Sequence, residues 1–463
     1  MKKNIAVFFA ALLAAAVPAG AEEWNTMGPR AMGMGGAGVA LAQGPLASYW
    51  NPAALGLASE NSYGFVLPIS VHAALTGSAV AGANDLMNTY TNCKANPTLA
   101  CIGEAQYAVN ELSNPTNGLR VDGSVGGDFK VGPIAFFSNA FLDAGAAPRV
   151  DTVNINPFPG LNNIASNTSA LIVKGARILE FGAGYGREIP YVPGLFLGGN
   201  LKVMSAEVGY VDYLVLQNND HSSNVLGALK DDTATSANVG LDAGALWDVD
   251  RTFQDVWWRP RVGLTGRNLN NPKFSQPGSA AADGAGGSYA VNPQARLGLA
   301  ISPLHWWNFA ADVDLTRNLT PVNGVASRQL DLGTEINVFN RSWIDIPLRV
   351  GFARNVENAT NMFTAGAGVN LLHLMIDISG EVSPTTVQTQ NQGGSTKIPE
   401  ELGASVSLSI LFGGSEDRPS HAKSSDDYSP PQAAAPAQAD QIRAHAAGAQ
   451  QEMDQVKPQP MGN

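Results

Sequence analysis

Apolar and polar residues alternate along most of the chain from residue 61 to residue 412. In ELGASVSLSILF (401–412), Val406, Leu408 and Ile410 share one face, and the serines between them share the other. The segments NMFTAGAGVNLL and WIDIPLRVGFARN alternate in the same way. A period of two over about ten residues predicts strands that have one apolar and one polar face.

Turn-forming residues divide this region into about fourteen such strands. They lie near 61–71, 119–131, 133–142, 176–188, 195–208, 235–248, 259–268, 292–302, 306–315, 328–338, 343–354, 361–371, 374–382 and 401–412. A tilted strand of about ten residues crosses the hydrocarbon core of a bilayer, and single-chain bacterial barrels have an even number of strands. The pattern therefore predicts an all-β fold, a transmembrane antiparallel β-barrel.

The connections between these strands alternate between long and short. Outer-membrane barrels have long outside loops and short periplasmic turns, whereas a soluble β-sandwich has no reason to alternate so regularly. The long connections are 72–118, 143–175, 209–234, 269–291, 316–327, 355–360 and 383–400, and the short ones are 132, 189–194, 249–258, 303–305, 339–342 and 372–373.

Tryptophan positions agree with this topology. Indole rings prefer the interface between membrane and water, so tryptophans at one end of the barrel would form a periplasmic girdle. Six of the eight lie at or beside the short connections: Trp247, Trp257, Trp258, Trp306, Trp307 and Trp343.

The composition also suits a membrane barrel. Charged residues make up 14% of the chain, well below the roughly 25% of an average soluble protein. Beyond the first 21 residues, no segment has the run of about 20 apolar residues that a membrane helix needs. The net charge of −11 argues against direct binding of nucleic acid, which requires clustered Lys and Arg.

The chain opens with the features of a secretory signal peptide. Lys2 and Lys3 precede an apolar run at 5–16, and AGA at 19–21 fits a small-residue cleavage site. An uncleaved anchor is the alternative, but the run is too short to span a bilayer. We therefore expect export to the bacterial outer membrane and a mature chain that begins at Glu22, with both of its ends in the periplasm.

GMGGAG at 33–38 fits the G-x-G-x-x-G spacing of a dinucleotide-binding loop. That function needs a preceding strand and a following helix, and here no strand precedes the glycines. We interpret Gly33, Gly35, Gly36 and Gly38 instead as positions without side chains, which let the segment pack tightly inside a barrel lumen.

A short helical turn is expected after these glycines. Asn51 can cap a helix start, Pro52 suits the first helical position, and Gly56 can end the turn. Together with Ala53, the first two form an Asn-Pro-Ala motif. The N-terminal arm is therefore predicted to be a plug, or hatch, in the lumen.

These features divide the chain into four regions. The C-terminal region is rich in Ala, Pro and Gln and short of large apolar residues, so we expect a disordered, low-complexity periplasmic tail. The regions are a signal peptide at 1–21, the hatch at 22–60, the barrel at 61–412 and the tail at 413–463.

Cys93 and Cys101 are the only cysteines, and they lie in one polar connection. In an exported protein we expect them to form a disulfide that closes a short loop. A metal site is the weaker interpretation, because two thiols without nearby His or further Cys cannot complete a zinc shell. We therefore expect no metal and no cofactor.

Several segments resemble known outer-membrane proteins. The N-terminal arm, with its motif Asn51-Pro52-Ala53, is similar to the hatch of FadL-like transporters of hydrophobic compounds. GLTGRNLNNPKF (263–274), VNPQARLGLAISP (291–303) and AADVDLTRNLTP (310–321) look like the conjugal-transfer TraF-like family, which is FadL-like in fold. The resemblance spans about residues 25–412, and the tail departs from it.

This resemblance implies a fourteen-stranded barrel that is plugged by its N-terminal residues. It implies a hatch-gated passive channel for a hydrophobic or amphipathic small molecule. The alternative is an accessory or structural role in conjugation, without transport, because fold does not settle function. The implied partners are outer-membrane lipid, a hydrophobic solute, and envelope or conjugation proteins bound through the outside loops or the tail.

Strand parity points nine acidic and five basic side chains toward the lumen. Buried charges need partners, so we expect a network across the lumen that rigidifies the barrel and holds the plug. The alternative is a polar pathway or a site for a solute headgroup. The acids are Glu180, Asp242, Asp312, Asp314, Asp331, Glu335, Asp345, Asp377 and Glu381, and the bases are Lys202, Arg261, Arg267, Arg296 and Arg349.

The sequence does not suggest an enzyme. A nucleophile or an activated water needs an aligned base, which is most often His. Of the six histidines, only His72 is expected to point inward, at the end of a strand.

Overall fold

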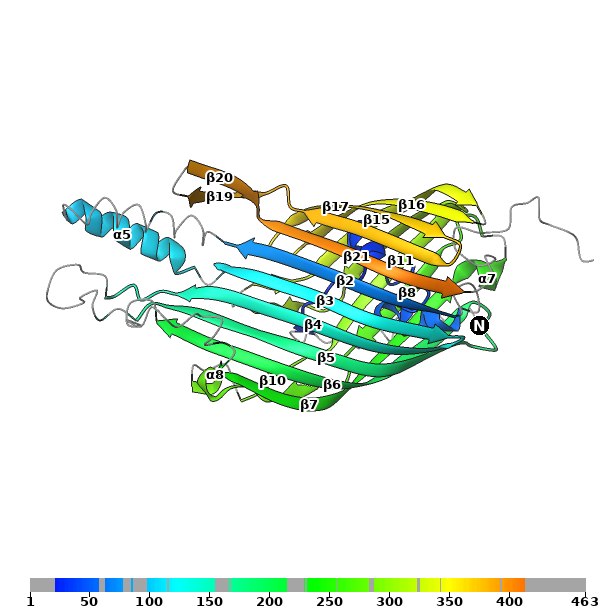
Figure 1. Ribbon diagram of the computed structural model, residues 1–463, viewed down its shortest axis with the longest axis horizontal. Coiled ribbons are helices and arrows are strands. Elements are labelled where there is room, and N and C mark those ends of the chain that lie inside the picture. Colours follow the sequence, from blue (N-terminus) through cyan, green and yellow to red (C-terminus); the bar gives the residue numbers. More distant parts are fainter. Residues whose placement is uncertain are drawn as a thin grey trace, which may run out of the picture.

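Fourteen strands close into one antiparallel barrel within the part of the chain that the computed structural model describes (Figure 1). The predicted signal peptide except Ala21, the tail and Cys93 lie outside the described residues. The description covers 21–57, 63–77, 85, 98–114, 116–154, 166, 168–214, 229, 231–254, 256–282, 287–322, 325–341, 343–391 and 394–412.

Each barrel strand pairs with its neighbours along the chain, and the first strand, β2, closes the ring by pairing with the last, β21. The strands are β2 (Tyr63–Thr76), β3 (Gly118–Val131), β4 (Ile134–Arg149), β5 (Ala170–Glu188), β6 (Leu195–Leu214), β7 (Thr233–Asp248), β8 (Arg261–Arg267), β11 (Gln294–Leu304), β12 (Trp307–Asp314), β15 (Gln329–Arg341), β16 (Ile344–Asn355), β17 (Asn361–Leu371), β18 (Leu374–Val382) and β21 (Glu401–Phe412). The predicted barrel and its number of strands are therefore confirmed.

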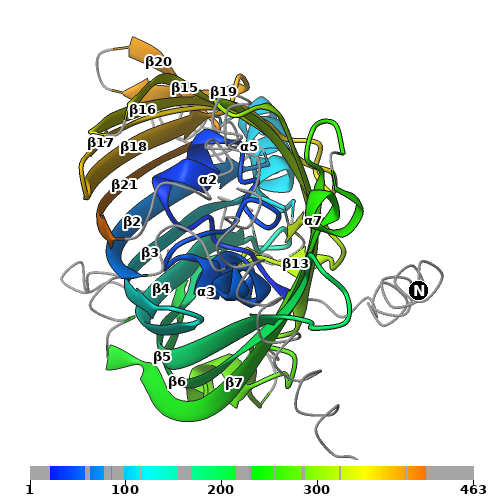
Figure 2. The ribbon, with the colours of Figure 1, turned by 90° about the vertical axis from the view of Figure 1, so that its right-hand side faces the viewer.

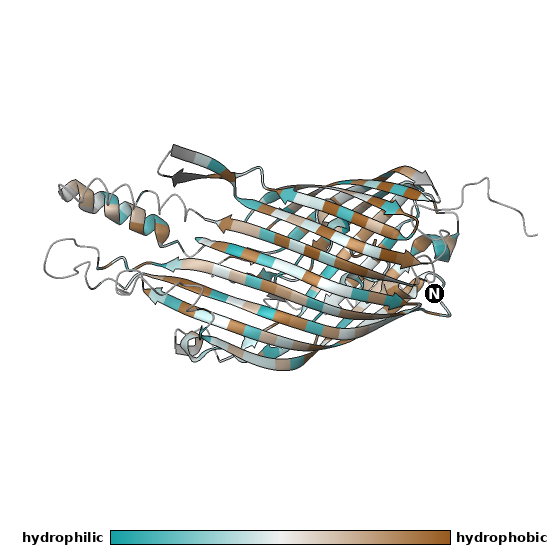
Figure 3. Ribbon diagram, in the orientation of Figure 1, coloured by the Kyte–Doolittle hydropathy of each residue, from teal (hydrophilic) through white to brown (hydrophobic). Residues whose placement is uncertain are grey.

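Apolar and polar residues alternate along the barrel strands (Figure 3), so the two faces of the wall differ in polarity, as the sequence predicts. On β21, Ser407 and Ser409 point inward and are buried, whereas Leu408 and Ile410 are each 41% exposed on the outside. Such an outer face, with apolar side chains at every second position, is typical of contact with lipid.

Short connections gather at one end of the barrel, called the short-connection end, and the long ones at the other, called the long-connection end (Figure 1). The short-connection end carries helix α7 (Val249–Phe253), followed by the exposed Trp257 and Trp258. The long connections carry small elements that strand periodicity does not predict: α5 (Leu99–Leu112), β9 (Lys273–Phe274), α8 (Gly278–Ala282), β10 (Tyr289–Ala290), β13 (Asn318–Leu319), β14 (Ala326–Ser327), β19 (Thr386–Asn391) and β20 (Gly394–Pro399).

The expectation that the mature chain begins at the end of the barrel with the short connections is wrong, and the mature C-terminus lies outside the described residues. Strand β1 (Ala21–Glu22) pairs with β13, which belongs to the connection between β12 and β15 at the long-connection end. Phe412 ends β21 at the short-connection end, opposite Tyr63. The chain therefore runs along the lumen from one end to the other before β2 begins. This direction could not be predicted, because the segment is glycine-rich and has no periodic pattern of apolar residues.

Candidate functional site

Residues 23–57, here called the N-terminal segment, lie inside the barrel (Figure 2). They form two short α-helices, α2 (Pro29–Gly33) and α3 (Ala47–Trp50), and a 3-10 helix, η1 (Pro52–Gly56). Almost all of their side chains are buried. The lumen is thus filled by a separate stretch of chain as well as by side chains from the wall.

Aromatic rings anchor the middle of the N-terminal segment. The Trp24 and Trp50 rings stack with their centroids 6.4 Å apart, and the Tyr49 ring stacks on Phe141 of the wall at 5.8 Å. The Arg267 guanidinium lies 4.2 Å from the centroid of the Tyr49 ring, within the range of a cation–π contact. These contacts fix the segment to β4 and β8.

Gly35 lies where the structure leaves no room for a side chain. Its φ is +73°, and a Cβ there would lie 2.6 Å from the Phe352 carbonyl oxygen and 2.7 Å from that of Leu332. The wall contributes a matching glycine, because a Cβ on Gly351 would lie 2.2 Å from the Gly35 nitrogen. That nitrogen donates a hydrogen bond of 2.9 Å to Thr364 Oγ1. Backbone therefore packs directly on backbone.

The other glycines of GMGGAG are also closely packed. A Cβ on Gly33 would lie 3.1 Å from the Gly366 Cα, and one on Gly38 would lie 2.6 Å from the Trp50 ring. Gly36 has a φ of +97°, which side-chain-bearing residues rarely adopt. The packing role expected for these glycines fits the structure, and their role in gating stays a prediction.

The Asn-Pro-Ala motif lies against a second glycine-rich part of the wall. Asn51 Oδ1 accepts a hydrogen bond of 3.1 Å from the Ala53 nitrogen, the cap expected at the start of η1. Asn51 Nδ2 donates to the Ala245 carbonyl of β7 at 3.1 Å. A Cβ on Gly198 of β6 would lie 2.3 Å from the Pro52 oxygen. One side chain thus caps η1 and ties it to the wall.

Asn51→Ala is expected to loosen the end of the segment by about 1–2 kcal/mol, because it removes a cap and leaves a buried carbonyl without its donor. Hydrogen exchange of 23–57 in the assembled barrel measures this loosening. Asn114→Ala is the matched control, since Asn114 caps an exposed turn by accepting from the Thr116 nitrogen. Equal exchange in the two variants would contradict the prediction.

A wall carboxylate binds the backbone of the segment directly. Asp312 Oδ2 accepts hydrogen bonds from the nitrogens of Gly38, at 2.8 Å, and Val39, at 2.9 Å. Asp312 is only 1% exposed. These two main-chain N–H groups donate charge-assisted hydrogen bonds to the Asp312 carboxylate. The segment therefore stabilises this buried acid through its backbone and not through a charged side chain.

An ion-pair chain joins helix α2 to three wall strands. Arg30 contacts Glu335 with both ends of its guanidinium, at 3.0 Å from Nε and 2.8 Å from Nη2. Arg349 donates to Glu335 from Nε at 2.7 Å and to Asp377 from Nη1 at 2.5 Å. Two cations and two anions balance, which is the condition under which charges tolerate burial.

Arg296 forms a neighbouring cluster on β11. Its Nε donates to Asp314 Oδ1 at 2.6 Å and its Nη1 to Asp331 Oδ2 at 3.0 Å. The same Nη1 also reaches the Gly36 carbonyl at 3.4 Å. This guanidinium therefore connects two wall acids with the glycine loop of the N-terminal segment.

A third cluster lies across the lumen on β5–β8. Lys202 Nζ lies 3.0 Å from Glu180 Oε1 and 3.1 Å from Asp242 Oδ1, and Arg267 Nη2 lies 3.4 Å from Glu180 Oε2. Asn200 of β6 donates from Nδ2 to the Ser48 carbonyl at 2.7 Å. The β5–β8 side of the wall therefore also binds the N-terminal segment, through the side-chain amide of Asn200.

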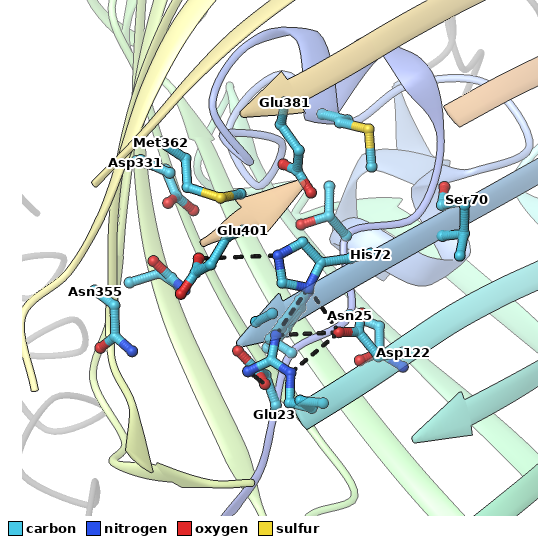
Figure 4. A pocket seen from close by; sticks show the side chains of 18 of the residues that line it. Glu23, Asn25, Ser70, His72, Asp122, Asp331, Asn355, Met362, Glu381 and Glu401 are labelled. Atoms are coloured by element: carbon cyan, nitrogen blue, oxygen red, sulfur yellow. Dashed lines mark hydrogen bonds and ion pairs between the residues drawn. The ribbon is translucent and has the colours of Figure 1, made fainter. Parts of the chain in front are cut away.

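Beside Glu23, at the long-connection end of the segment, lies a polar pocket, called the outer pocket (Figure 4). Arg120 pairs with Glu23 of the segment and, at 3.0 Å, with Asp122 of the wall. His72 lies between two carboxylates, with Nδ1 2.9 Å from Asp122 Oδ2 and Nε2 3.9 Å from Glu401 Oε2. The first residues of the segment are thus tied to β3, and His72 of β2 contacts Asp122 of β3.

Acids outnumber bases around the outer pocket, since Glu381 and Asp331 also line it. Glu400, just before β21, has a raised pKa because it is partly buried and because the charge of Glu401 lies nearby. The pocket has a volume of about 50 Å³, which suits a few water molecules rather than an organic solute. We therefore interpret the charged residues of the outer pocket as groups that hold the N-terminal segment in place, not as a solute site.

A second, more apolar pocket lies at the short-connection end, between the segment and the wall. Met27, Met34 and Leu41 line it from the segment, and Met375 and Leu411 line it from the wall. Its volume is about 110 Å³, still below the roughly 300 Å³ of a typical small-molecule site.

The predicted lumen charges mostly lie where strand parity places them. Arg261 pairs with Asp248 at 3.0 Å, apart from the clusters around the segment, and Asp345 is buried elsewhere on the wall, in β16. The clusters take up the others: Arg267, Arg296, Asp312, Asp314, Asp331, Glu335, Arg349, Asp377 and Glu381, with Glu180, Asp242 and Lys202.

Four important partners were not predicted from the sequence. Arg120 and Asp122 alternate in LRVDGSV and could have been assigned inward by the same parity rule. Arg30 and Glu23 lie in the aperiodic segment, where no sequence pattern indicates their partners.

Neither a metal centre nor a membrane helix is found in the described ranges. No group of three or more His, Cys, Asp or Glu is placed to hold a metal ion there. No helix among the described residues has the length and apolar character needed to cross a membrane. Cys101 lies in α5, and its pairing with Cys93, which is outside the described residues, stays a prediction.

Comparison with known proteins gives one family and several similar structures. The profile of the family described as "F plasmid transfer operon, TraF, protein" matches residues 48–314. No curated protein matches the sequence. Among solved structures, the Pseudomonas putida toluene transporter TodX is 12% identical, with 85% of this chain and 100% of that chain covered and a TM-score of 0.47. The Ralstonia pickettii toluene transporter TbuX is 14% identical (83% and 98% covered, TM-score 0.45), and a Pseudomonas aeruginosa FadL homologue is 13% identical (85% and 100% covered, TM-score 0.41).

Proposed function

The chain belongs to the family of the F plasmid transfer operon TraF protein, and we propose that it is an outer-membrane barrel whose N-terminal segment gates the passage of a small hydrophobic or amphipathic molecule. The exposed apolar stripe supports placement in a lipid bilayer. The predicted signal peptide supports export to the outer membrane.

The observation that carries this proposal is that a separate chain segment fills the lumen. An eight-stranded barrel is just wide enough for its own side chains, and barrels of about 16 strands enclose an open channel. A barrel of fourteen strands lies near the wider limit. Displacement of the N-terminal segment would therefore open a path through the barrel lumen that is wide enough for a small molecule.

The chemistry around the segment supports an apolar or amphipathic cargo. At the short-connection end, the space between segment and wall is lined by Met27, Met34 and Leu41, which are flexible or apolar side chains. Most of the exposed lining there is apolar, so a strongly hydrated ion would recover little of the hydration that it loses. A hydrophobic molecule has no such hydration to lose.

A second candidate is an accessory role in conjugation or envelope assembly, with the segment as a fixed stopper. The family description favours it, and so does the number of independent ties. Ion pairs at Arg30 and Glu23, backbone hydrogen bonds to Asp312 and the Asn51 cap all hold the same segment. A stopper held so redundantly has no need to move.

Deleting residues 22–50 behind the intact signal peptide separates these functions. We expect an assembled, heat-modifiable barrel with raised single-channel conductance and raised liposome uptake of a hydrophobic probe, because the deletion empties the lumen. A chain lacking 413–463 is the control for the loss of a terminal region. An assembled barrel with unchanged conductance and flux would instead favour the accessory role.

A further inference from the structure

A cavity of about 300 Å³ lies at the long-connection end, apart from the outer pocket. Lys174 and Tyr210 line it from the barrel wall, while Tyr289, Leu319 and Pro321 line it from connections that fold inward. Its volume is at the lower end of the range for small-molecule sites. Of the cavities described above, it alone reaches that range.

One side of this cavity is apolar. Val208 and Tyr289 belong both to its lining and to a buried apolar cluster. The other members of that cluster are Ala176, Ile178, Met204, Ala206, Phe274 and Val291. Burial of a short hydrocarbon chain against Val208 and Tyr289 would be favourable, because it removes apolar surface from water.

The polar side carries one charge of each sign. Lys174 pairs with Gly145 across the β4–β5 ladder, so it is a diagonal neighbour of Asp143. Asp143 acts on the Lys174 ammonium electrostatically. Because the two charges compensate, an ionised headgroup finds no net opposite charge here to repay the loss of its own hydration.

The uncharged groups complete this polar side. Gln276 and Asn292 bring side-chain amides, and Tyr210 and Tyr289 bring phenols. Such groups both donate and accept hydrogen bonds. They suit a head that does the same without carrying a charge, such as a hydroxyl or an amide.

We propose that this cavity binds a neutral amphiphile, a molecule with a short apolar body and a hydroxyl or amide head. The inference rests on the proposed transport function and names the class of solute that the barrel takes up first. It separates that class from ionised fatty acids and from amines.

The test compares 1-hexanol, hexanoate and hexylammonium at pH 7. Their binding to the full-length protein in lipid nanodiscs is measured by calorimetry, with empty nanodiscs as the blank. Hexanol is expected to bind about tenfold more tightly than either ion, because the ions lose hydration without a net partner.

Two charge variants give opposite expectations. Asp143→Asn removes the carboxylate charge that acts on the Lys174 ammonium, so the preference should move about tenfold toward hexanoate. Lys174→Gln leaves the Asp143 carboxylate, so the preference should move by about the same factor toward hexylammonium. Arg177→Gln is the matched control, because Arg177 lies on the same strand but is exposed and pairs with Glu207.

Ala280→Trp adds a test that leaves the wall unchanged. Ala280 lies on α8 in an inward-folded connection and lines the cavity. An indole there should reduce the binding of all three probes at least about tenfold by filling the site.

The inference is overturned if hexanol binds no better than the ions, or if assembled charge variants keep the wild-type ratios of affinity among the three probes. It is also overturned if Ala280→Trp binds like the wild type. Liposome flux of the wild type is measured separately. Flux without binding at the cavity would overturn this inference and support transport, whereas binding without flux would support the site and count against transport.

Discussion

Gly35→Val is expected to displace the N-terminal segment and to make liposomes leak a hydrophobic probe. The left-handed φ of +73° and a Cβ 2.6 Å from the Phe352 carbonyl oxygen both oppose a branched side chain. Left-handed backbone and overpacking together should weaken docking of the segment by about 3 kcal/mol. The neighbouring atoms are backbone atoms of β15 and β16, so the barrel cannot relax around the new side chain.

Gly132→Val is the control that isolates this contact. Gly132 also has a positive φ, of +56°, but nothing lies within 4 Å of a Cβ there, in the turn between β3 and β4. Both variants should still assemble as heat-modifiable barrels. If probe efflux is the same in both variants, the segment still closes the lumen when Gly35 is enlarged. The proposal that the GMGGAG loop gates the barrel is then wrong.

The barrel was predictable because lipid and lumen impose a strict period of two. Strand β21 was predicted at 401–412 and is found at Glu401–Phe412, and β17 and β18 agree equally well. The agreement between predicted and observed strand bounds is weaker at the long-connection end. Strand β5 begins at Ala170 rather than near residue 176, because its first residues, ALIVKG, do not alternate clearly.

The family was also predictable, since the resemblance to the TraF-like family is confirmed by the match at 48–314. Helix α5 was missed although its signal was present. Thr98 caps it by accepting from the Cys101 nitrogen, and LACIGEAQYAVNEL contains many good helix formers.

The candidate site was only half predictable. Parity shows that Glu335 and Arg349 point inward, but it does not show which charges meet. Arg30 contacts Glu335 across 305 positions of sequence, and no local pattern carries that information. The direction of the segment was likewise hidden, because contacts such as β1 with β13 depend on closure of the whole barrel.

The contact between Arg30 and Glu335 gives the second large effect. Glu335→Gln removes the anion that both Arg30 and Arg349 contact, so a buried cluster with balanced charges gains a net positive charge. Removing one partner of a buried ion pair costs about 3–5 kcal/mol. We therefore expect rapid hydrogen exchange in 23–57 and increased probe leak, with the outer apolar face unchanged.

Adding Arg30→Gln to Glu335→Gln tests whether the loss comes from this charge. In the double variant Arg349 still pairs with Asp377, at 2.5 Å in the native protein, and the cluster is neutral again. Exchange and leak should therefore return part of the way toward the wild type, as a double-mutant cycle shows for coupled residues. Glu207→Gln is the matched control, because it breaks an exposed pair with Arg177 that contributes at most about 1 kcal/mol. If the effects of the two single changes simply add, Arg30 and Glu335 are not coupled, and the ion pair does not hold the segment in the lumen.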